Sequence, residues 1–303
     1  IIFSPVYGSL TREIMNKSNN RSDIIILDIG QSFNDINETL AVLNEFKHYP
    51  MKNFIWIDHH KWKEEILHEF KNILLVQEKD SCAQVVNPDL INSFCRSIIF
   101  YDADCDGILS AVLMAAGNKL SQCETNLIID IATRCDTADF ISNRKAFTLH
   151  KAVYMARMNE NTKNSFNLIL EELLKWALNG MIFTKKIFNY TFELSRLYDE
   201  NILKTNEEII EKPIYNDGKI IVFNTSYIQW ADLSYVCNYF YNLKFKYVLF
   251  VNTSGITINT NDKSKDLTKI FNQCGIKYKI FIVRKENHIC DLQEIIDKIN
   301  TID

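Results

Sequence analysis

Four short, largely apolar runs in the first half of the chain are each followed, directly or within two residues, by an aspartate. Runs this short and this continuously apolar are typical of strands covered on both faces, as in a parallel sheet with flanking helices. Ligands of open α/β sheets bind at the carboxyl ends of the strands, so we expect the acids to gather at one edge of the sheet. The runs cover residues 24–27, 54–57, 97–100 and 127–129, and the acids are Asp28, Asp58, Asp102 and Asp130.

The pattern changes twice after this region, which predicts three parts. Residues 146–210 contain no Pro and a single Gly, and their apolar positions recur at helical spacing, so we expect a helical connector there. Strand patterns then return. The predicted fold is α/β, with a parallel-sheet domain over residues 1–145, the connector over 146–210 and a smaller α/β domain over 211–303. In the last part, strands are expected at 219–223, 247–251, 256–260 and 279–283, and helices at 230–243, 264–273 and 291–300.

Composition narrows the classes of partner and compartment. The net charge is −4, whereas a protein that coats long nucleic acid usually carries a basic surplus. This balance disfavours an extended nucleic-acid binder and leaves short substrates open. The eight cysteines form no C-x-x-C pair, which predicts buried free thiols and favours a reducing, cytoplasmic location. No apolar run reaches the length of a membrane span, so no membrane partner is expected.

The triplet Asp58-His59-His60 follows directly on one of the predicted strands. Two adjacent histidines are costly to bury unless they bind metal or anions. One imidazole can then ligate a divalent ion while the other faces a phosphate, and Asp58 can orient its neighbour. Taken alone, the triplet is equally consistent with a pair of surface histidines in a loop.

Three alternating aspartates follow another predicted strand, in the turn Asp102-Ala103-Asp104-Cys105-Asp106-Gly107. Such a turn repels itself unless cations bind to it. A calcium loop of the helix–loop–helix kind requires a bidentate Glu at its twelfth position, where this chain has Leu113. The calcium-loop interpretation therefore fails. A strand, an acidic turn and a helix are the layout of a catalytic metal site in a phosphoesterase.

Two weaker acidic sites complete the set of candidates. Asp28 ends a predicted strand, and Asp136 lies in the stretch 132–140 with Asp130 upstream of it. Oxygen and imidazole donors without thiolates suit Mn²⁺ or Mg²⁺. Together these residues are sufficient to hold two ions about 3.5–4 Å apart, the spacing used in phosphoryl transfer.

These motifs resemble those of the DHH phosphoesterase superfamily, which includes RecJ-type exonucleases, nanoRNases, pAp phosphatases, cyclic-dinucleotide phosphodiesterases and family II pyrophosphatases. The acidic turn at 102–107 is similar to the first motif of the family in its RecJ-like form. Asp28 resembles the second motif, the triplet at 58–60 the third, and residues 135–137 the fourth. Residues 80–86 also resemble the small-residue helix that follows the third motif.

The resemblance implies a centre of two divalent cations, with Mn²⁺ favoured and Mg²⁺ as the alternative. His60 would face the scissile phosphate, and Asp130 is the substitute for Asp136. One ion would be held by Asp102, Asp104 and Asp28, and the other by Asp106, Asp28, His59 and Asp136.

The chain departs from the family pattern in two places. The acidic turn is expected first in the chain, where residues 1–9 contain no acid, and it comes third here. We interpret the motif order as II, III, I, IV, in a rearranged sheet that rebuilds the same site; the alternative is that the original site has decayed. The accessory domain of the family also carries a Gly-Gly-Gly-His run, and residues 271–276 contain one Gly and no His.

The predicted activity is two-metal-dependent hydrolysis of phosphodiester bonds in short single-stranded oligonucleotides or small nucleotides. His60, Asp58 and Arg134 are the predicted catalytic residues, although Arg134 is also suited to a surface ion pair with an acid such as Asp130. In the accessory domain, Lys263, Lys265 and Arg284 are weaker candidates for substrate binding, since a basic run is also typical of a solvated face. The alternatives are a pAp phosphatase or pyrophosphatase of the same superfamily and a non-catalytic replication scaffold derived from RecJ.

Overall fold

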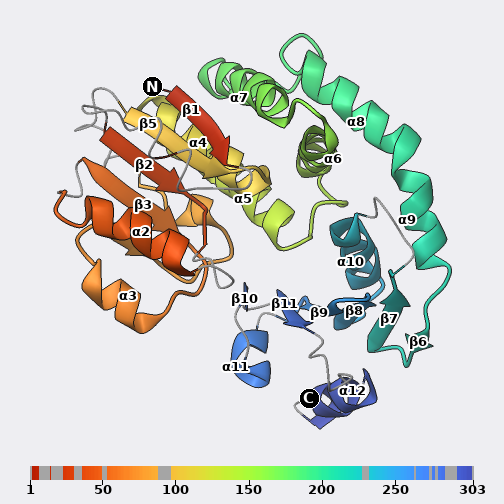
Figure 1. Cartoon of the computed structure of the whole chain (residues 1–303). Helices are drawn as coiled ribbons and strands as arrows, with labels where there is room; N and C mark the ends of the chain where they lie inside the picture. Colours follow the sequence, from red (N-terminus) through yellow and green to blue (C-terminus); the bar gives the residue numbers. More distant parts are fainter. Residues whose placement is uncertain are drawn as a thin grey trace. The chain divides into compact units, whose positions relative to one another are not determined.

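Figure 1 shows the computed structural model of the chain, which forms two compact units, Ile1–Asp199 and Glu200–Asp303. The described residues are 2–6, 14, 23–30, 36–49, 53–87, 97–226, 232–262, 264–272, 275–276, 279–283 and 292–301.

The first unit contains a sheet of five parallel strands in the order β1-β5-β2-β3-β4. Strand β5, which leads into the acidic turn, lies between β1 and β2 and pairs with both. Strand β3, which ends in the Asp-His-His triplet, pairs with the other side of β2. Asp28 comes first in the chain, the triplet second and the acidic turn third. In the sheet, however, the strands that carry them lie side by side in the order β5, β2, β3, so that Asp28 lies between the acidic turn and the triplet. The strands are β1 (Ile2–Val6), β2 (Asp23–Leu27), β3 (Phe54–Asp58), β4 (Leu74–Val76) and β5 (Ser97–Asp102).

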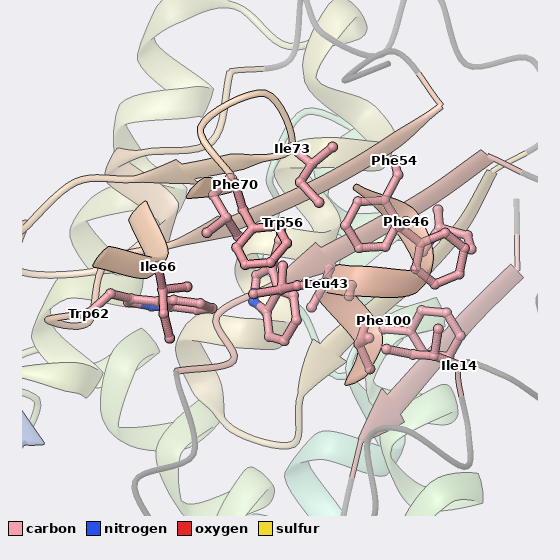
Figure 2. Close-up of a cluster of buried hydrophobic side chains, with 14 of the residues drawn as sticks. Ile14, Leu43, Phe46, Phe54, Trp56, Trp62, Ile66, Phe70, Ile73 and Phe100 are labelled. Carbon is pink, nitrogen blue, oxygen red and sulfur yellow. The ribbon is translucent and has the colours of Figure 1, made fainter. Parts of the chain in front are cut away.

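Helices cover both faces of this sheet, as the apolar strands predict. On one face, α2 (Ile36–Phe46) and α3 (Glu64–Glu69) pack over an aromatic core (Figure 2). Phe46 of α2 stacks on Phe54 of β3 with ring centroids 4.5 Å apart, and Trp56 meets Trp62 edge to face at 5.3 Å. On the other face, α4 (Cys105–Ala116) contacts β5 and β2. Because α4 is apolar on all sides, it is buried along almost its whole length.

The predicted strand at 127–129 is wrong, because these residues lie in α5 (Gln122–Asp136). The buried positions of this helix are Ile128, Ile131, Ala132 and Cys135, which follow the spacing of one helical face. A capping box between Ser121 and Glu124 starts the helix. An apolar run of three residues is too short to distinguish a strand from a helix. Asp130 consequently lies on a helix surface and not at the end of a strand.

The remaining helices of the first unit occupy most of the predicted connector. They are α6 (Arg144–Met158), α7 (Thr162–Leu178) and α8 (Asn189–Asn201), while α9 (Leu203–Ile210) belongs to the second unit. Helix α4 contacts both α6 and α7, and α7 contacts β1. The separate roles given to the three predicted parts stay predictions.

The start of α8 is held by Glu172 of α7. Its carboxylate accepts bonds from Tyr190 N at 2.7 Å, Thr191 N at 2.9 Å and Thr191 Oγ1 at 2.7 Å. Replacing Glu172 with Ala removes the acceptor for these donors, so we expect a loss of about 1–3 kcal/mol in the free energy of unfolding. Urea unfolding measures it, with the exposed neighbour Glu171→Ala as the matched control. Equal stability of the two variants would contradict this role.

The second unit is a smaller α/β fold with a six-stranded sheet in the order β10-β11-β9-β8-β7-β6. Strands β7 and β8 are parallel and the other pairs are antiparallel. The strands predicted near 220, 248, 257 and 280 are confirmed, as are the three helices. The elements are β6 (Tyr215–Asn216), β7 (Ile220–Asn224), α10 (Leu233–Asn242), β8 (Tyr247–Val251), β9 (Gly255–Thr260), α11 (Leu267–Phe271), β10 (Gly275–Ile276), β11 (Lys279–Val283) and α12 (Leu292–Thr301).

Two expectations from composition concern the whole chain. The five described cysteines are free thiols, and all of them except Cys123 are buried. In the described parts of the chain, no helix combines the length and the apolar character needed to cross a membrane.

Candidate metal centre

The carboxyl ends of three adjacent strands and the ends of two helices bring the acidic motifs of the first unit together. Asp28 follows β2, Asp58 ends β3, and Asp102 ends β5. The first turn of α4 supplies Asp106, and the last residue of α5 is Asp136. This edge of the parallel sheet is where the strand pattern predicts a ligand site.

Asp28 is buried, and its backbone has a conformation that residues other than Gly rarely adopt. Its φ is 59°, and its backbone N donates to Ile57 O at 3.0 Å, which fixes the turn at the end of β2. Its Oδ1 atom is buried without a hydrogen-bond partner. Burial raises the pKa of Asp28 well above its usual range, and the charges of Asp106 and Asp104 raise it further. A cation at Oδ1 would satisfy this oxygen and reverse that shift.

His59 points a ring nitrogen at the same place. Its Nδ1 lies 3.1 Å from Lys79 O, and since a carbonyl can only accept, Nδ1 donates this bond and Nε2 is the ring nitrogen that faces the acids. Nε2 lies 3.2 Å from Asp28 Oδ1, 3.7 Å from Asp106 Oδ2 and 3.8 Å from Asp136 Oδ2. Although the first distance is short, no hydrogen bond is formed to Asp28 Oδ1. One imidazole nitrogen and three carboxylate oxygens that converge in this way are suited to bind a divalent cation.

Asp106 is fixed by backbone donors from a segment distant in the sequence. Cys82 N donates to its Oδ2 at 2.5 Å and Ala83 N to its Oδ1 at 3.1 Å, both from the short helix η1 (Cys82–Gln84). Ser110 Oγ adds a bond of 3.3 Å. Burial and the charge of Asp136 raise the pKa of Asp106 to about 7, and a cation nearby would favour its ionised form. The small-residue segment after the triplet is therefore a single turn that orients a candidate ligand.

The acidic turn itself is held from within. Asp104 Oδ1 caps α4 by accepting from Gly107 N at 2.7 Å, and Asp102 Oδ1 accepts from Ala103 N at 2.7 Å. Burial and the charge of Asp104 raise the pKa of Asp102 to about 7. Gly107 packs directly on Asp102, because a Cβ at this position would lie 2.3 Å from Asp102 O. The acidic turn at 102–107 therefore requires a glycine at position 107, because no Cβ fits against the backbone of Asp102.

In the Asp-His-His triplet, the second histidine has a different environment from the first. Asp58 Oδ1 lies 2.7 Å from His60 Nδ1, and Asp58 Oδ2 accepts from Trp62 Nε1 at 2.6 Å, so both oxygens of this buried acid are engaged. Against the effect of burial, the charge of Asp58 raises the pKa of His60 to about 9. Likewise against burial, the charge of His60 lowers the pKa of Asp58. His60 is therefore a cation at neutral pH, and its orientation is set by Asp58.

Two tryptophans support this edge and were not predicted from the sequence as site residues. Trp62 holds Asp58, and Trp56 Nε1 donates to Ile29 O at 2.8 Å, which holds the turn after Asp28. Gly30 in the same turn packs on His60, since a Cβ there would lie 3.1 Å from His60 Cγ. A Trp shortly after the triplet was the available sequence signal, but apolar packing explains such a residue equally well.

The other predicted site residues lie elsewhere. Arg134 pairs with Asp130 at 3.0 Å and Asp139 at 2.9 Å on the surface of α5, which is the second of the two roles considered for it. Between the two candidates for the fourth motif, the structure brings Asp136 to His59 and leaves Asp130 nearly half exposed. Lys265 is half-buried in the second unit, and Lys263 and Arg284 lie outside the described residues.

An arginine that no motif indicated reaches the acidic turn. Arg157, in the last turn of α6, donates from Nε to Ala103 O, and its Nη2 lies 3.8 Å from Asp104 Oδ2. Sequence reasoning missed it because 53 positions separate it from Asp104 and no pattern connects them.

No protein-family model and no curated protein matches the sequence. Among solved structures, the chain is similar to the pGpG-specific phosphodiesterase PggH from Vibrio cholerae, with 9% identity, a TM-score of 0.43, and coverage of 93% of this chain and 98% of that one. It is also similar to exonuclease RecJ bound to manganese, with 12% identity, a TM-score of 0.45, and coverage of 98% and 78%. A putative family II inorganic pyrophosphatase from Methanococcus jannaschii gives 14% identity, a TM-score of 0.20, and coverage of 91% and 80%.

The chain has an α/β fold, and its acidic motifs lie at the ends of three adjacent strands and two helices. All three likenesses are distant, so the chemistry assigned to the site rests on its own side chains.

The metal-free protein is expected to lose stability as the pH rises from about 4 to about 9. The pKa values of Asp102 and Asp106 are raised to about 7 and that of His60 to about 9. A raised pKa contributes stability that is present below the unfolded value, about 4 for Asp and 6.5 for His, and is lost as the pH passes the folded value. Urea unfolding with a chelator at about pH 5 and about pH 8 measures this loss. Mn²⁺ should reduce it, because metals bind the deprotonated ligands. Equal or higher stability at the upper pH with chelator would contradict the expectation.

Proposed function

We propose that this protein is a divalent-metal-dependent phosphoesterase that hydrolyses phosphodiester bonds in short single-stranded oligonucleotides or small nucleotides. The observation that carries the proposal is the convergence of His59 Nε2 with carboxylate oxygens of Asp28, Asp106 and Asp136. A buried set of acceptors of this kind repels itself unless a cation binds to it.

The residues present fit a two-cation centre. Asp28 Oδ1 is buried without a hydrogen bond, and His59 Nε2 lies 3.2 Å from it. We assign His59, Asp28, Asp106 and Asp136 to one ion, and Asp102, Asp104 and Asp28 to the other, with Mn²⁺ favoured over Mg²⁺ for this donor set. When bound, the ions would lower the pKa of water and neutralise phosphate charge.

The chain's own contribution to the reaction is positioning and charge. His60, held as a cation by Asp58, is a quarter exposed beside the acids and is suited to contact a phosphate oxygen. Trp62 and Asp58 keep its ring in one orientation, with Nδ1 engaged and Nε2 free of Asp58. No covalent nucleophile is needed for this chemistry. The net charge of −4 favours a short substrate over a long nucleic acid. The free thiols agree with a cytoplasmic location, which is part of the same proposal.

The experiment is a comparison of three substrates with Mn²⁺: a labelled short oligonucleotide, pAp and pyrophosphate. Wild type should release mononucleotides from the oligonucleotide, and His59→Ala should lose more than about 100-fold of this rate, since even residues behind the ligands contribute 10- to 100-fold. Asp139→Asn, a surface change on the loop after α5, is the matched control. Activity on pAp or pyrophosphate alone would select the alternative phosphatase or pyrophosphatase. If wild type and His59→Ala are equally inert on all three and neither binds Mn²⁺, the protein is a scaffold and the proposal is wrong.

A further inference from the structure

Arg157 places a guanidinium group at the side of the acidic turn. The residue is the last arginine of α6, and its side chain is 40% exposed. One part of it is fixed, because Nε donates to Ala103 O, the carbonyl between the two acids of the turn. The rest is not fixed, because Nη2 lies 3.8 Å from Asp104 Oδ2, beyond hydrogen-bond distance.

This geometry is unlike that of Arg134. Both guanidinium ends of Arg134 are engaged, with Nε bound to Asp130 and Nη1 to Asp139. Arg157 is anchored by a neutral carbonyl, and its charge makes one long ion-pair contact, from Nη2 to Asp104 Oδ2 at 3.8 Å. In Asp104, the nearest acid, Oδ1 already accepts the hydrogen bond that caps α4. A guanidinium presents its N–H groups as a planar fork that matches the oxygens of a phosphate.

We propose that Arg157 binds a phosphate group of the substrate beside the metal centre. The inference rests on the proposed phosphoesterase activity and adds the residue that grips the phosphate on the Asp104 side of the site. His60 then contacts phosphate from the β3 side and Arg157 from the α6 side. The competing role is structural, with Arg157 acting only as a clamp that holds the acidic turn in place. The bond to Ala103 O alone would suffice for that role.

The two roles differ in what they do to ligand binding. If Arg157 binds phosphate, Arg157→Gln should weaken the binding of adenosine monophosphate in the presence of Mn²⁺ by about 10- to 100-fold, the effect of a lost charge-assisted bond pair. Binding of Mn²⁺ without nucleotide should not weaken, because the change removes a positive charge beside Asp104, and the binding of adenosine should not change. Arg157→Lys, which keeps the charge but loses the fork, should fall between wild type and Arg157→Gln.

Calorimetric titration of these variants with Mn²⁺, adenosine monophosphate and adenosine provides the measurement. Arg144→Gln, at the exposed first turn of the same helix, is the matched control and should bind like wild type. If Arg157→Gln weakens Mn²⁺ binding as much as nucleotide binding, or if nucleotide binding is unchanged, Arg157 is a clamp and the inference is wrong. If nucleotide binding depends on Arg157 but wild type hydrolyses no substrate, the proposed function fails while the phosphate site stands.

Discussion

Replacing Asp28 with Asn is expected to abolish Mn²⁺-dependent hydrolysis and, at the same time, to make the metal-free protein more stable. Asp28 is buried, its Oδ1 atom has no hydrogen-bond partner, and its pKa is raised well above the usual range by burial and by Asp106. In the absence of metal, burying this carboxyl group at neutral pH is therefore a cost to folding. An amide at this position carries no charge, and we expect the free energy of unfolding to rise by about 1 kcal/mol.

The same change removes the carboxylate that we assign to both ions. Mn²⁺ should stabilise wild type by about 2.7 kcal/mol at a hundred times its dissociation constant, and it should stabilise Asp28→Asn far less. Activity should fall by more than about 100-fold. Urea unfolding with chelator and with Mn²⁺ measures both effects. Asp130→Asn, a change of the same kind at an exposed acid of α5, should show neither. A metal-free Asp28→Asn protein that is less stable than wild type would show that this carboxylate has a structural partner.

A methyl group at position 107 is expected to disrupt the centre without touching any ligand side chain. A Cβ added to Gly107 would lie 2.3 Å from Asp102 O and 2.9 Å from Asp102 N, and both atoms belong to the backbone. Relief requires α4 to move away from β5. That movement is opposed at the start of the helix, where Gly107 N is bound to Asp104 and the Asp106 carboxylate is bound by Cys82 N and Ala83 N.

We therefore expect Gly107→Ala to lower the free energy of unfolding by about 1–3 kcal/mol or more and to remove Mn²⁺ binding together with activity. Chelator-dependent unfolding curves and calorimetric Mn²⁺ titration measure the two effects. Gly117→Ala is the control, because Gly117 ends the same helix with a φ of −49°, which Ala adopts without strain. Wild-type Mn²⁺ affinity in Gly107→Ala would mean that the turn adapts, and the close packing would then be incidental.

Sequence reasoning succeeded where the pattern is local and strongly apolar. The run at 54–57 is long enough and bounded clearly enough to be recognised as a strand, and its end places the triplet correctly. The run at 127–129 is shorter, and the helical spacing of its neighbours decides its structure. That error moved Asp130 to a strand end, when Asp136 at the end of the helix is the acid that reaches His59.

Contacts between segments that are distant in the chain could not be predicted from the sequence. The donors that orient Asp106 are backbone N–H groups of Cys82 and Ala83, and nearly every residue type offers such a group. Arg157 reaches the acidic turn only because α6 packs beside α4, an arrangement that periodicity does not encode. The side-chain types of a site are therefore easier to predict than the residues that position them.

The place of β5 in the sheet has a consequence for how the protein is made. Strand β1 pairs with β5 alone in the described sheet, and its register joins Ile2 to Ile98. Strand β1 leaves the ribosome well before β5 and must wait for it, and β5 must then enter between two strands that are already synthesised. Pairing over such a sequence distance is slow, because the loop must close before its contacts form. A nascent chain that ends before residue 97 should remain sensitive to protease, and protection should appear only after β5 and α4 have emerged.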